Sequence, residues 1–341
     1  MKFTAQTFST LTLLLLLTSS GATTLFAQSE VGGGARARRV NASNKTSATA
    51  APLYESARSD KFTGGEVPRA KFAPGVSDVR ITVDVPAFRL NLWQAGKIVT
   101  TYPIGIGLFD FQVPVGSRSF TEIVYNPAWI PPPSGWVTER KGVKAGEIIT
   151  ASDPRNPLGK MKIPLGNGYL IHEARGVADL GNLVSHGCIR MLRRDLYDLA
   201  DKLIAARSLG VTVAEVARAK ATKKTLTIKL DAPLPIDLDY DTQVIEEGVL
   251  YIYPDVYERN TNTVTRLRQE LESTDVNPDA VDLPSYEKLL TRPTKTTAFA
   301  TPIASVEQNR ALTDGKLKPL VVLRTAAVVV PKAKRATRKR T

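Results

Sequence analysis

The chain has one cysteine, Cys188, and its two histidines, His172 and His186, both lie within 16 residues of that cysteine. A cysteine attacks a carbonyl group as the thiolate, and a neighbouring imidazole helps to remove the thiol proton. Gly187 directly precedes the cysteine and allows the backbone to approach a substrate closely. The cluster predicts a cysteine nucleophile that a histidine activates.

Two other interpretations of these residues stay open at this point. Two histidines and a cysteine could bind zinc together with a carboxylate or a water molecule. However, His186 and Cys188 are only two positions apart, and the sequence has no Cys-x-x-Cys or His-Glu-x-x-His, so we expect no metal and no cofactor. A buried, inert thiol is the other alternative, because free cysteines are commonly buried.

The elements that must position these residues are mostly strands. Apolar and polar residues alternate from Val79 to Val85 and again from Phe88 to Trp93, and Ile98 to Ile106 continues the pattern after a turn. This alternation predicts a hairpin meander with one buried face. Further strands are expected at Phe120–Val124 and at Gly168–His172.

Helical spacing follows the cysteine. Asp195, Leu196, Leu199 and Leu203 fall on one face of a predicted helix from about residue 194 to 206. We expect a strand at 211–213, a second and smaller set of strands within 225–260, and little order beyond about 291. Residues 134–160 are predicted to form a long loop, which in a compact domain is often a functional lid.

The N-terminus predicts export. Lys2 precedes an apolar stretch centred on Leu11–Leu17, and small residues follow, with cleavage expected after Ala22 or Ala27. The stretch is shorter than the roughly 20 residues that span a bilayer, and no later segment is long and apolar enough to do so. We therefore predict a signal peptide at 1–27, a flexible linker at 28–75 that is rich in small and polar residues, and no transmembrane span.

The chain is basic, with 46 Lys plus Arg against 33 Asp plus Glu and a net charge of +13. Six positive charges crowd the last ten residues: Lys332, Lys334, Arg335, Arg338, Lys339 and Arg340. Basic tails can bind nucleic acid, but an exported protein meets anionic envelope surfaces instead. We expect that partner, or a tail that only keeps the protein soluble, and no nucleic acid.

Around the cysteine, the sequence resembles the L,D-transpeptidase family with a YkuD-type catalytic domain. His172, a gap, and Ser185-His186-Gly187-Cys188 match the family signature. The flanking segments that match are Pro103–Gly107, Pro127–Pro132 and Asn156–Gly159. The resemblance implies a mainly β, sandwich-like catalytic domain at 76–217 with one or two short helices. A small C-terminal β-rich extension at 218–290 and a basic, largely disordered tail at 291–341 would follow it.

The resemblance also implies roles for residues. Cys188 would be the nucleophile and His172 the base. The residues expected to shape the site and its oxyanion hole are Gly187, His186, Ser185 and Glu173, and those expected to contact substrate are Arg190 and Trp129. A salt bridge that orders the loop is an equal alternative for Arg190, and a place in the core is the more common one for Trp129. Glu173 stands where the family often has a small residue, and its carboxylate could shift the pKa of His172.

The implied reaction joins or modifies peptidoglycan stem peptides in the periplasm through a cysteine thioester. Three alternatives remain open from the sequence: a non-catalytic protein that binds or anchors to the wall, a hydrolase in which water replaces the acceptor amine, and an enzyme that attaches a protein to peptidoglycan.

Overall fold

The structure, a computed structural model, describes residues 79–207, 209–274, 276–280 and 283–323. The predicted signal peptide, the linker and the six basic residues of the tail lie outside the described residues. Within those ranges, no helix combines the length and the apolar character needed to cross a membrane.

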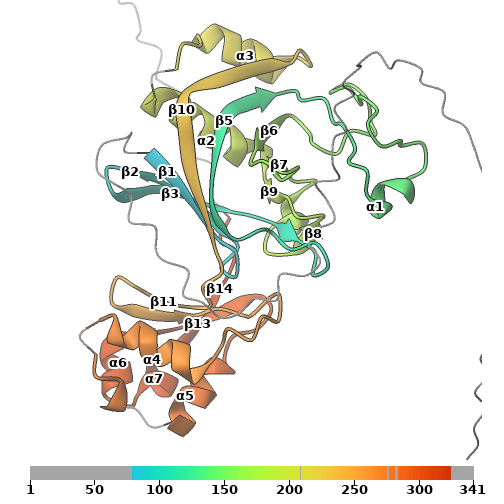
Figure 1. The fold of residues 1–341 in the computed structure, drawn as a ribbon. Coiled ribbons are helices and arrows are strands. Elements are labelled where there is room, and N and C mark those ends of the chain that lie inside the picture. The colour runs from blue at the N-terminus through green and yellow to red at the C-terminus, as the bar shows by residue number, and fades with distance from the viewer. Residues whose placement is uncertain (1–78, 208, 275, 281–282, 324–341) are drawn as a thin grey trace, which may run out of the picture. The chain divides into compact units, whose positions relative to one another are not determined.

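A mixed eight-stranded sheet forms the larger part of the fold (Figure 1). Its strand order is β3-β2-β1-β10-β5-β6-β7-β9, and two of its neighbouring pairs, β1 with β10 and β7 with β9, are parallel. The strands are β1 Val79–Asp84, β2 Arg89–Gln94, β3 Lys97–Pro103, β5 Gly116–Tyr125, β6 Met161–Pro164, β7 Leu170–Glu173, β9 Ile189–Met191 and β10 Leu226–Asp239. Two short strands, β4 (Ile106–Gly107) and β8 (Leu183–Ser185), pair with each other beside it. The mainly β fold is confirmed.

The predicted meander is present as β1, β2 and β3. Ile81, Val83 and Leu90 are fully buried, as the alternation requires. Ala95 and Gly96 join β2 to β3 with φ values of 52° and 69°. Positive φ at both central residues fits the twist of a two-residue hairpin.

Helix α2 (Arg193–Ala206) confirms the predicted helix and covers the sheet core. Leu196, Leu199 and Leu203 pack into the same hydrophobic cluster as β1, β5 and β7. Four-residue and three-residue spacing places them on one helix face, so α2 supports the strands on which the cysteine cluster depends.

The strand expected at 211–213 was wrong. Thr212 is instead the N-cap of helix α3 (Val213–Ala221), and Glu215 completes a capping box with it. The Thr212 hydroxyl accepts from the Glu215 N–H at 3.2 Å, and a Glu215 carboxylate oxygen accepts from the Thr212 N–H at 2.8 Å. These reciprocal bonds satisfy free donors at a helix start, which outweighs the strand preference of two valines.

The strand at 226–230 does not begin a separate set, contrary to expectation. It is the first half of β10, which lies between β1 and β5 and runs antiparallel to β5 and parallel to β1. Ile228, Leu234 and Ile236 are buried in the core of the large sheet. The larger sheet therefore continues past residue 217.

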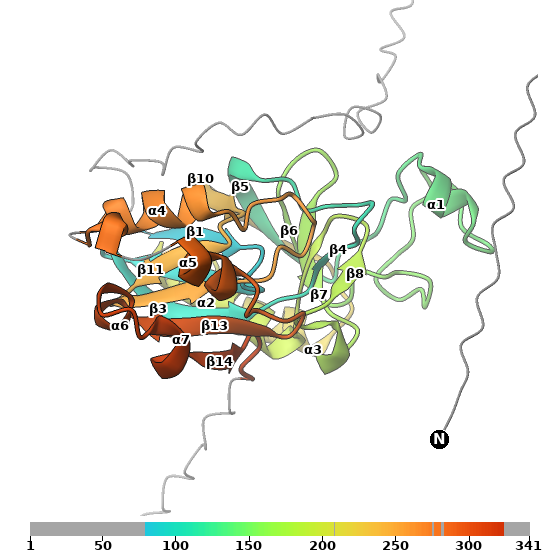
Figure 2. The ribbon, with the colours of Figure 1, turned by 90° about the horizontal axis from the view of Figure 1, so that it is seen from below.

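A second, four-stranded sheet in the order β11-β12-β13-β14 follows. Its strands are β11 Gln243–Glu246, β12 Val249–Ile252, β13 Thr297–Pro302 and β14 Lys316–Pro319. Helices α4 Val264–Glu272, α5 Leu283–Leu290, α6 Ile303–Glu307 and α7 Ala311–Asp314 accompany it, on one face of this sheet in both views (Figures 1 and 2). The second sheet thus spans residues 243–319 instead of the expected 218–290, and it is accompanied by helices that the sequence analysis did not foresee.

The expectation of little order beyond 291 was wrong for residues 297–319. Strand β13 pairs with β12 on one side and β14 on the other, and Phe299 is fully buried among Leu250, Leu267 and Tyr286. Burying this aromatic ring between a sheet and two helices offsets the weak strand preference of a Thr- and Ala-rich segment.

Candidate active site

Cys188 ends a tight turn between β8 and β9. The Ser185 hydroxyl donates to the Cys188 carbonyl oxygen at 2.5 Å and closes the turn. Gly187 has a φ of 96°, and a Cβ at this position would lie 2.7 Å from the ring of Tyr169. Only glycine fits here without displacing that ring, so the sequence Ser-His-Gly-Cys fixes the backbone at the thiol.

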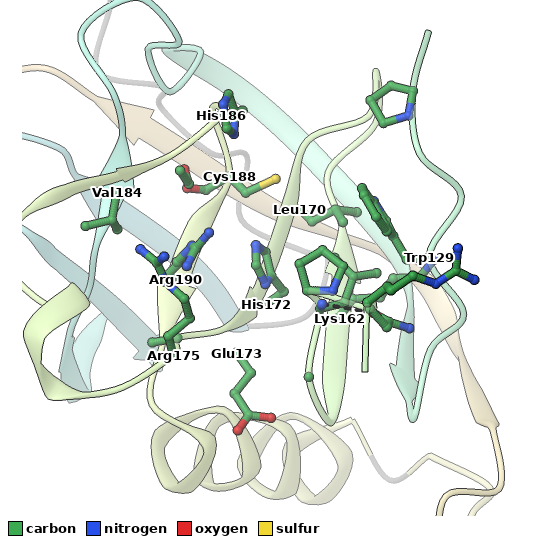
Figure 3. A pocket seen from close by; sticks show the side chains of 18 of the residues that line it. Trp129, Lys162, Leu170, His172, Glu173, Arg175, Val184, His186, Cys188 and Arg190 are labelled. Carbon is green, nitrogen blue, oxygen red and sulfur yellow. Dashed lines mark hydrogen bonds between the residues drawn. The ribbon is translucent and has the colours of Figure 1, made fainter. Parts of the chain in front are cut away.

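His172 is brought to the thiol by the parallel pairing of β7 with β9. The register places Ile171 opposite Ile189 and His172 opposite Arg190. The His172 side chain is only 3% exposed, whereas Cys188 is partly accessible. Both residues line one cavity of about 930 Å³, and Figure 3 shows the ring of His172 below the Cys188 side chain.

Burial keeps both groups neutral. It lowers the pKa of His172 to about 3, and the positive charge of Arg190 acts in the same direction. Burial raises the pKa of the Cys188 thiol to about 11, although the Leu170 backbone and Arg190 partly oppose this shift. At neutral pH both shifts favour a neutral thiol and a neutral imidazole over a preformed ion pair.

The side chain of Glu173 points away from His172 (Figure 3). Its carboxylate accepts from the Lys160 N–H at 2.6 Å and from Arg193 Nε at 2.8 Å. The backbone of Glu173, together with that of Leu158, favours the protonated ring of His172 and opposes the fall in its pKa. The Glu173 carboxylate is thus a link to helix α2, and the backbone is the part that acts on the histidine.

Arg190 forms the predicted salt bridge. Its Nη1 donates to Asp179 Oδ2 at 2.9 Å, and the two side chains are only 11% and 7% exposed. The Arg175 N–H donates to the same oxygen at 2.9 Å. Burial would raise the pKa of Asp179, but these hydrogen bonds and the Arg190 charge outweigh it and hold that pKa below its ordinary value. Arg190 still lines the cavity, so the salt bridge positions a guanidinium at the site.

His186 lies on the other side of Cys188 from His172 (Figure 3). Its ring stacks on Trp136 with centroids 4.2 Å apart and meets the Phe111 ring edge-on at 4.7 Å. Burial lowers the pKa of His186, and the charges of Arg190 and Arg140 add to this shift. The two histidines therefore have different surroundings: His172 is deep in the sheet, and His186 is held in an aromatic stack.

Residues 78–216 match the family model described as YkuD, the L,D-transpeptidase catalytic domain. This part of the chain belongs to the YkuD family of L,D-transpeptidase catalytic domains. The match includes every residue of the site described above and ends before strand β10, which completes the same sheet.

Relatives of the L,D-transpeptidase domain include the probable L,D-transpeptidase ErfK/SrfK of Salmonella typhimurium, 32% identical over 140 residues. The alignment covers 40% of this chain and 44% of that protein. The putative L,D-transpeptidase YkuD of Bacillus licheniformis is 28% identical over 159 residues, which cover 44% of this chain and 80% of the relative. The chain thus spans less than half the length of the first of these relatives.

Among solved structures, the chain is similar to an L,D-transpeptidase from Mycobacterium smegmatis. That similarity has a TM-score of 0.30 and 16% sequence identity, over 48% of this chain and 59% of the other.

The long loop of the L,D-transpeptidase domain forms one wall of the cavity. It carries the short helix α1 (Gly135–Thr138) and a hydrophobic cluster of its own, which contains Trp129, Val137, Val143, Ile149 and Leu158. The Trp129 and Ile149 backbones exchange two hydrogen bonds, of 2.8 and 2.9 Å. Trp129 is 5% exposed, so it is first a core residue of this loop, and it also lines the cavity.

The sequence analysis missed three residues of the site, Asp179, Trp136 and Lys162. Besides Glu173, which was predicted, Asp179 is the only acidic residue between His172 and Cys188, and this scarcity was a usable signal. The sequence holds no local signal for the role of Trp136, because its stacking partner His186 lies 50 positions away. Lys162 lies opposite His172 in the β6–β7 pairing and lines the cavity, where burial lowers its pKa. Such a pairing follows from sheet register, which short sequence windows do not reveal.

Among the described residues, no group of three or more His, Cys, Asp or Glu side chains is arranged to hold a metal ion. His172 and His186 lie on opposite sides of Cys188 (Figure 3), and this arrangement differs from a set of ligands that converge on one point.

Proposed function

We propose that the chain is an exported L,D-transpeptidase that modifies peptidoglycan stem peptides through a thioester at Cys188. The observation that carries the proposal is a thiol and a neutral imidazole that line one cavity in a domain of the YkuD family. A neutral imidazole is a base that is ready to take the thiol proton as the sulfur attacks.

The reaction has two halves. In the first, the Cys188 sulfur attacks the carbonyl carbon of the third stem residue, a diacid such as diaminopimelate, while His172 takes the thiol proton. The bond to the terminal D-alanine breaks, its nitrogen leaves with the proton from His172, and a thioester remains. In the second half, an acceptor amine attacks the thioester carbon and forms a new amide bond while the bond from that carbon to sulfur breaks. His172 takes a proton from the amine and passes it to the Cys188 sulfur that leaves.

The oxyanion that forms in each half requires hydrogen-bond donors. The backbone N–H groups of Gly187 and Cys188 are the candidates, because neither donates to another described residue. Each well-placed donor contributes roughly 3 kcal/mol to the stability of a tetrahedral intermediate. The bond from Ser185 to the Cys188 carbonyl supports this role, since it holds the turn in one conformation.

The charges around the cavity suit a peptide that bears carboxylates. The cationic residues in its lining are Arg140, Arg155, Lys162, Arg175 and Arg190, and the anionic ones are Glu139 and Glu173. Arg190 is the most direct candidate for a substrate carboxylate, because its Nε is buried and makes no hydrogen bond with the described residues. A guanidinium that keeps one free donor beside a carboxylate partner can still bind a second anion.

The testing experiment is incubation with purified muropeptides, followed by mass analysis of the products. A cross-linked product that wild type forms and Cys188→Ala does not would support transpeptidation. A tripeptide product alone would identify a hydrolase, and a lysine-linked product with an added protein would identify protein attachment.

A carbapenem provides a second test: one stoichiometric adduct is expected on wild type and none on Cys188→Ala. A folded wild type that stays unmodified by both reagents would contradict the proposal and favour a wall-binding protein.

A further inference from the structure

The segment from Gly107 to Val113 forms a wall against the nucleophile turn. The Leu108 N–H donates to the Ser185 carbonyl at 2.7 Å, and Phe111 meets His186 edge-on. A Cβ on Gly107 would lie 3.1 Å from the Cα of Gly187 and 1.9 Å from the carbonyl oxygen of Phe111. The segment and the turn are therefore packed with no space between them, and a shift of one moves the other.

Two side chains from the C-terminal part of the chain hold this segment. The Tyr257 hydroxyl donates to the Gly107 carbonyl at 3.0 Å and accepts from the Val113 N–H at 3.3 Å, so it joins the two ends of the segment. Arg259 donates from Nε and Nη2 to the side-chain oxygen of Gln112 at 2.9 and 2.6 Å. Tyr257 is only 2% exposed, so water does not compete for its hydroxyl.

Tyr257 and Arg259 are themselves held rigidly. The Tyr257 ring stacks on Tyr240 at 5.6 Å, and the Arg259 guanidinium lies 4.4 Å from the centroid of the Tyr240 ring. The Tyr240 hydroxyl donates to Asp255 at 2.6 Å and accepts from the Tyr257 N–H at 2.7 Å. Glu258 and Asn260, on either side of Arg259, have φ values of 50° and 55°. A left-handed glutamate is strained, and the surrounding bonds keep it in place.

We propose that Tyr257 and Arg259 are positioning residues of the cysteine site. They fix the segment 107–113 and, through it, the turn that carries Cys188. In this respect the C-terminal part of the chain completes the L,D-transpeptidase domain. The inference rests on the proposed function for its kinetic test and on the contacts alone for its structural test.

The kinetic test compares single-turnover acylation of Cys188 by a carbapenem in Tyr257→Phe, Arg259→Ala and wild type. Tyr257→Phe keeps the ring stack and removes only the hydroxyl, and Arg259→Ala removes the bonds to Gln112. We expect each to slow acylation about 10- to 100-fold, because displacements near 1 Å at a reacting group have effects of this size. The double variant Gln112→Ala/Arg259→Ala should be no slower than Arg259→Ala.

Arg266→Ala is the matched control. Arg266 pairs with Asp241 at 2.8 Å in the same part of the chain, and within the described residues it makes no hydrogen bond or ion pair with segment 107–113. It should acylate at the wild-type rate. If wild type is acylated and Tyr257→Phe and Arg259→Ala match it, the positioning inference fails while the proposed function stands.

Hydrogen exchange gives the structural test, which does not depend on activity. Arg259→Ala should speed amide exchange in 107–113 and in 185–190, with the thermal midpoint close to that of Arg266→Ala. Unchanged exchange in 185–190 would overturn the inference whether or not wild type is acylated. If exchange speeds while wild type resists the carbapenem, the positioning stands and the proposed function fails.

Discussion

At the scale of single residues, burial shifts the protonation of the two central groups of the candidate site. The same low-polarity surroundings that lower the pKa of His172 to about 3 raise that of Cys188 to about 11. Both shifts favour the neutral forms, so in the proposed reaction the thiol proton moves during the attack and not before it. We propose His172 as the general base, and His186, which also lines the cavity, is the alternative to test.

The two histidines should separate cleanly in kinetics. We expect His172→Ala to lower the rate of acylation by a carbapenem by about 100- to 10,000-fold, the usual contribution of a general base. His186→Ala should slow acylation less. His186→Phe is the matched control, because it preserves the aromatic contacts with Trp136 and Phe111. If acylation is slower in the His186 variants than in His172→Ala while all variants stay folded, the base is His186.

The buried histidine also predicts a dependence of stability on pH. Between its folded pKa of about 3 and an ordinary pKa near 6.5, the unfolded chain binds a proton that the folded chain excludes. The unfolded state therefore gains stability relative to the folded state as the pH falls from 6.5 toward 3, and the free energy of unfolding decreases. Between pH 7.5 and pH 5, the free energy of unfolding of His172→Gln should fall by about 2 kcal/mol less than that of wild type. Urea unfolding at both pH values measures this, and equal losses in the two proteins would contradict it.

The candidate site at residue scale could be located in the sequence because rare residue types cluster there. Cys188 and both histidines are few enough to stand out, and their spacing carried the family resemblance. The partners of these residues were not predictable in the same way. Tyr257 and Arg259 come from positions far along the chain, and their contacts with the 107–113 segment depend on how the C-terminal part packs.

At the scale of elements, the long loop is ordered by its own small core and by one amide. Asn156 Nδ2 donates to the carbonyl oxygens of Pro127, Ile149 and Thr150 at 3.0, 3.2 and 3.1 Å, and its side-chain oxygen accepts from the Leu158 N–H at 2.9 Å. A single side chain therefore links both ends of the loop, which explains how an irregular segment can form a cavity wall.

Asn156→Ala should loosen this loop without unfolding the sheet. Each lost hydrogen bond contributes about 1 kcal/mol, and the loop contributes a wall and not the nucleophile. We expect faster amide exchange across 127–160 and a several-fold higher KM for a muropeptide donor. Thr138→Ala is the control, because the Thr138 hydroxyl donates to the Gly135 carbonyl within α1 and bonds to nothing else in the described part of the chain. A KM equal to that of the control would show that the wall does not contact substrate.

Elements with local signals were predicted, and those set by distant partners were not. The meander and α2 follow from alternation and helical spacing. Helix α3 was missed although Thr212 and Glu215 carry the signal of a capping box. Strand β13 has no such signal, since its order comes from Phe299 and from pairing with β12, which lies about fifty residues earlier.

At the scale of the whole molecule, the basic tail is predicted to bind the protein to the cell envelope and to have no part in the reaction. A truncation ending near Val330 removes all six tail charges. We expect it to keep turnover on soluble muropeptides and to lose salt-sensitive binding to sacculi, because exposed charge contacts are screened by salt. Binding that is unchanged at low salt would contradict the role of the tail, and lost turnover would mean that the tail supports the active site.

The position of β10 has a consequence for how the protein reaches this fold. Strands β1 and β5 each pair with β10, although about 140 and 100 residues of chain separate them from it. Closing such long loops is slow, because their entropy is lost before the contacts form. A fragment cut at residue 216 would leave β1 and β5 as two open edges, which favour aggregation. A chain that emerges N-terminus first therefore cannot complete this sheet until strand β10, which ends at Asp239, is free to pair with β1 and β5.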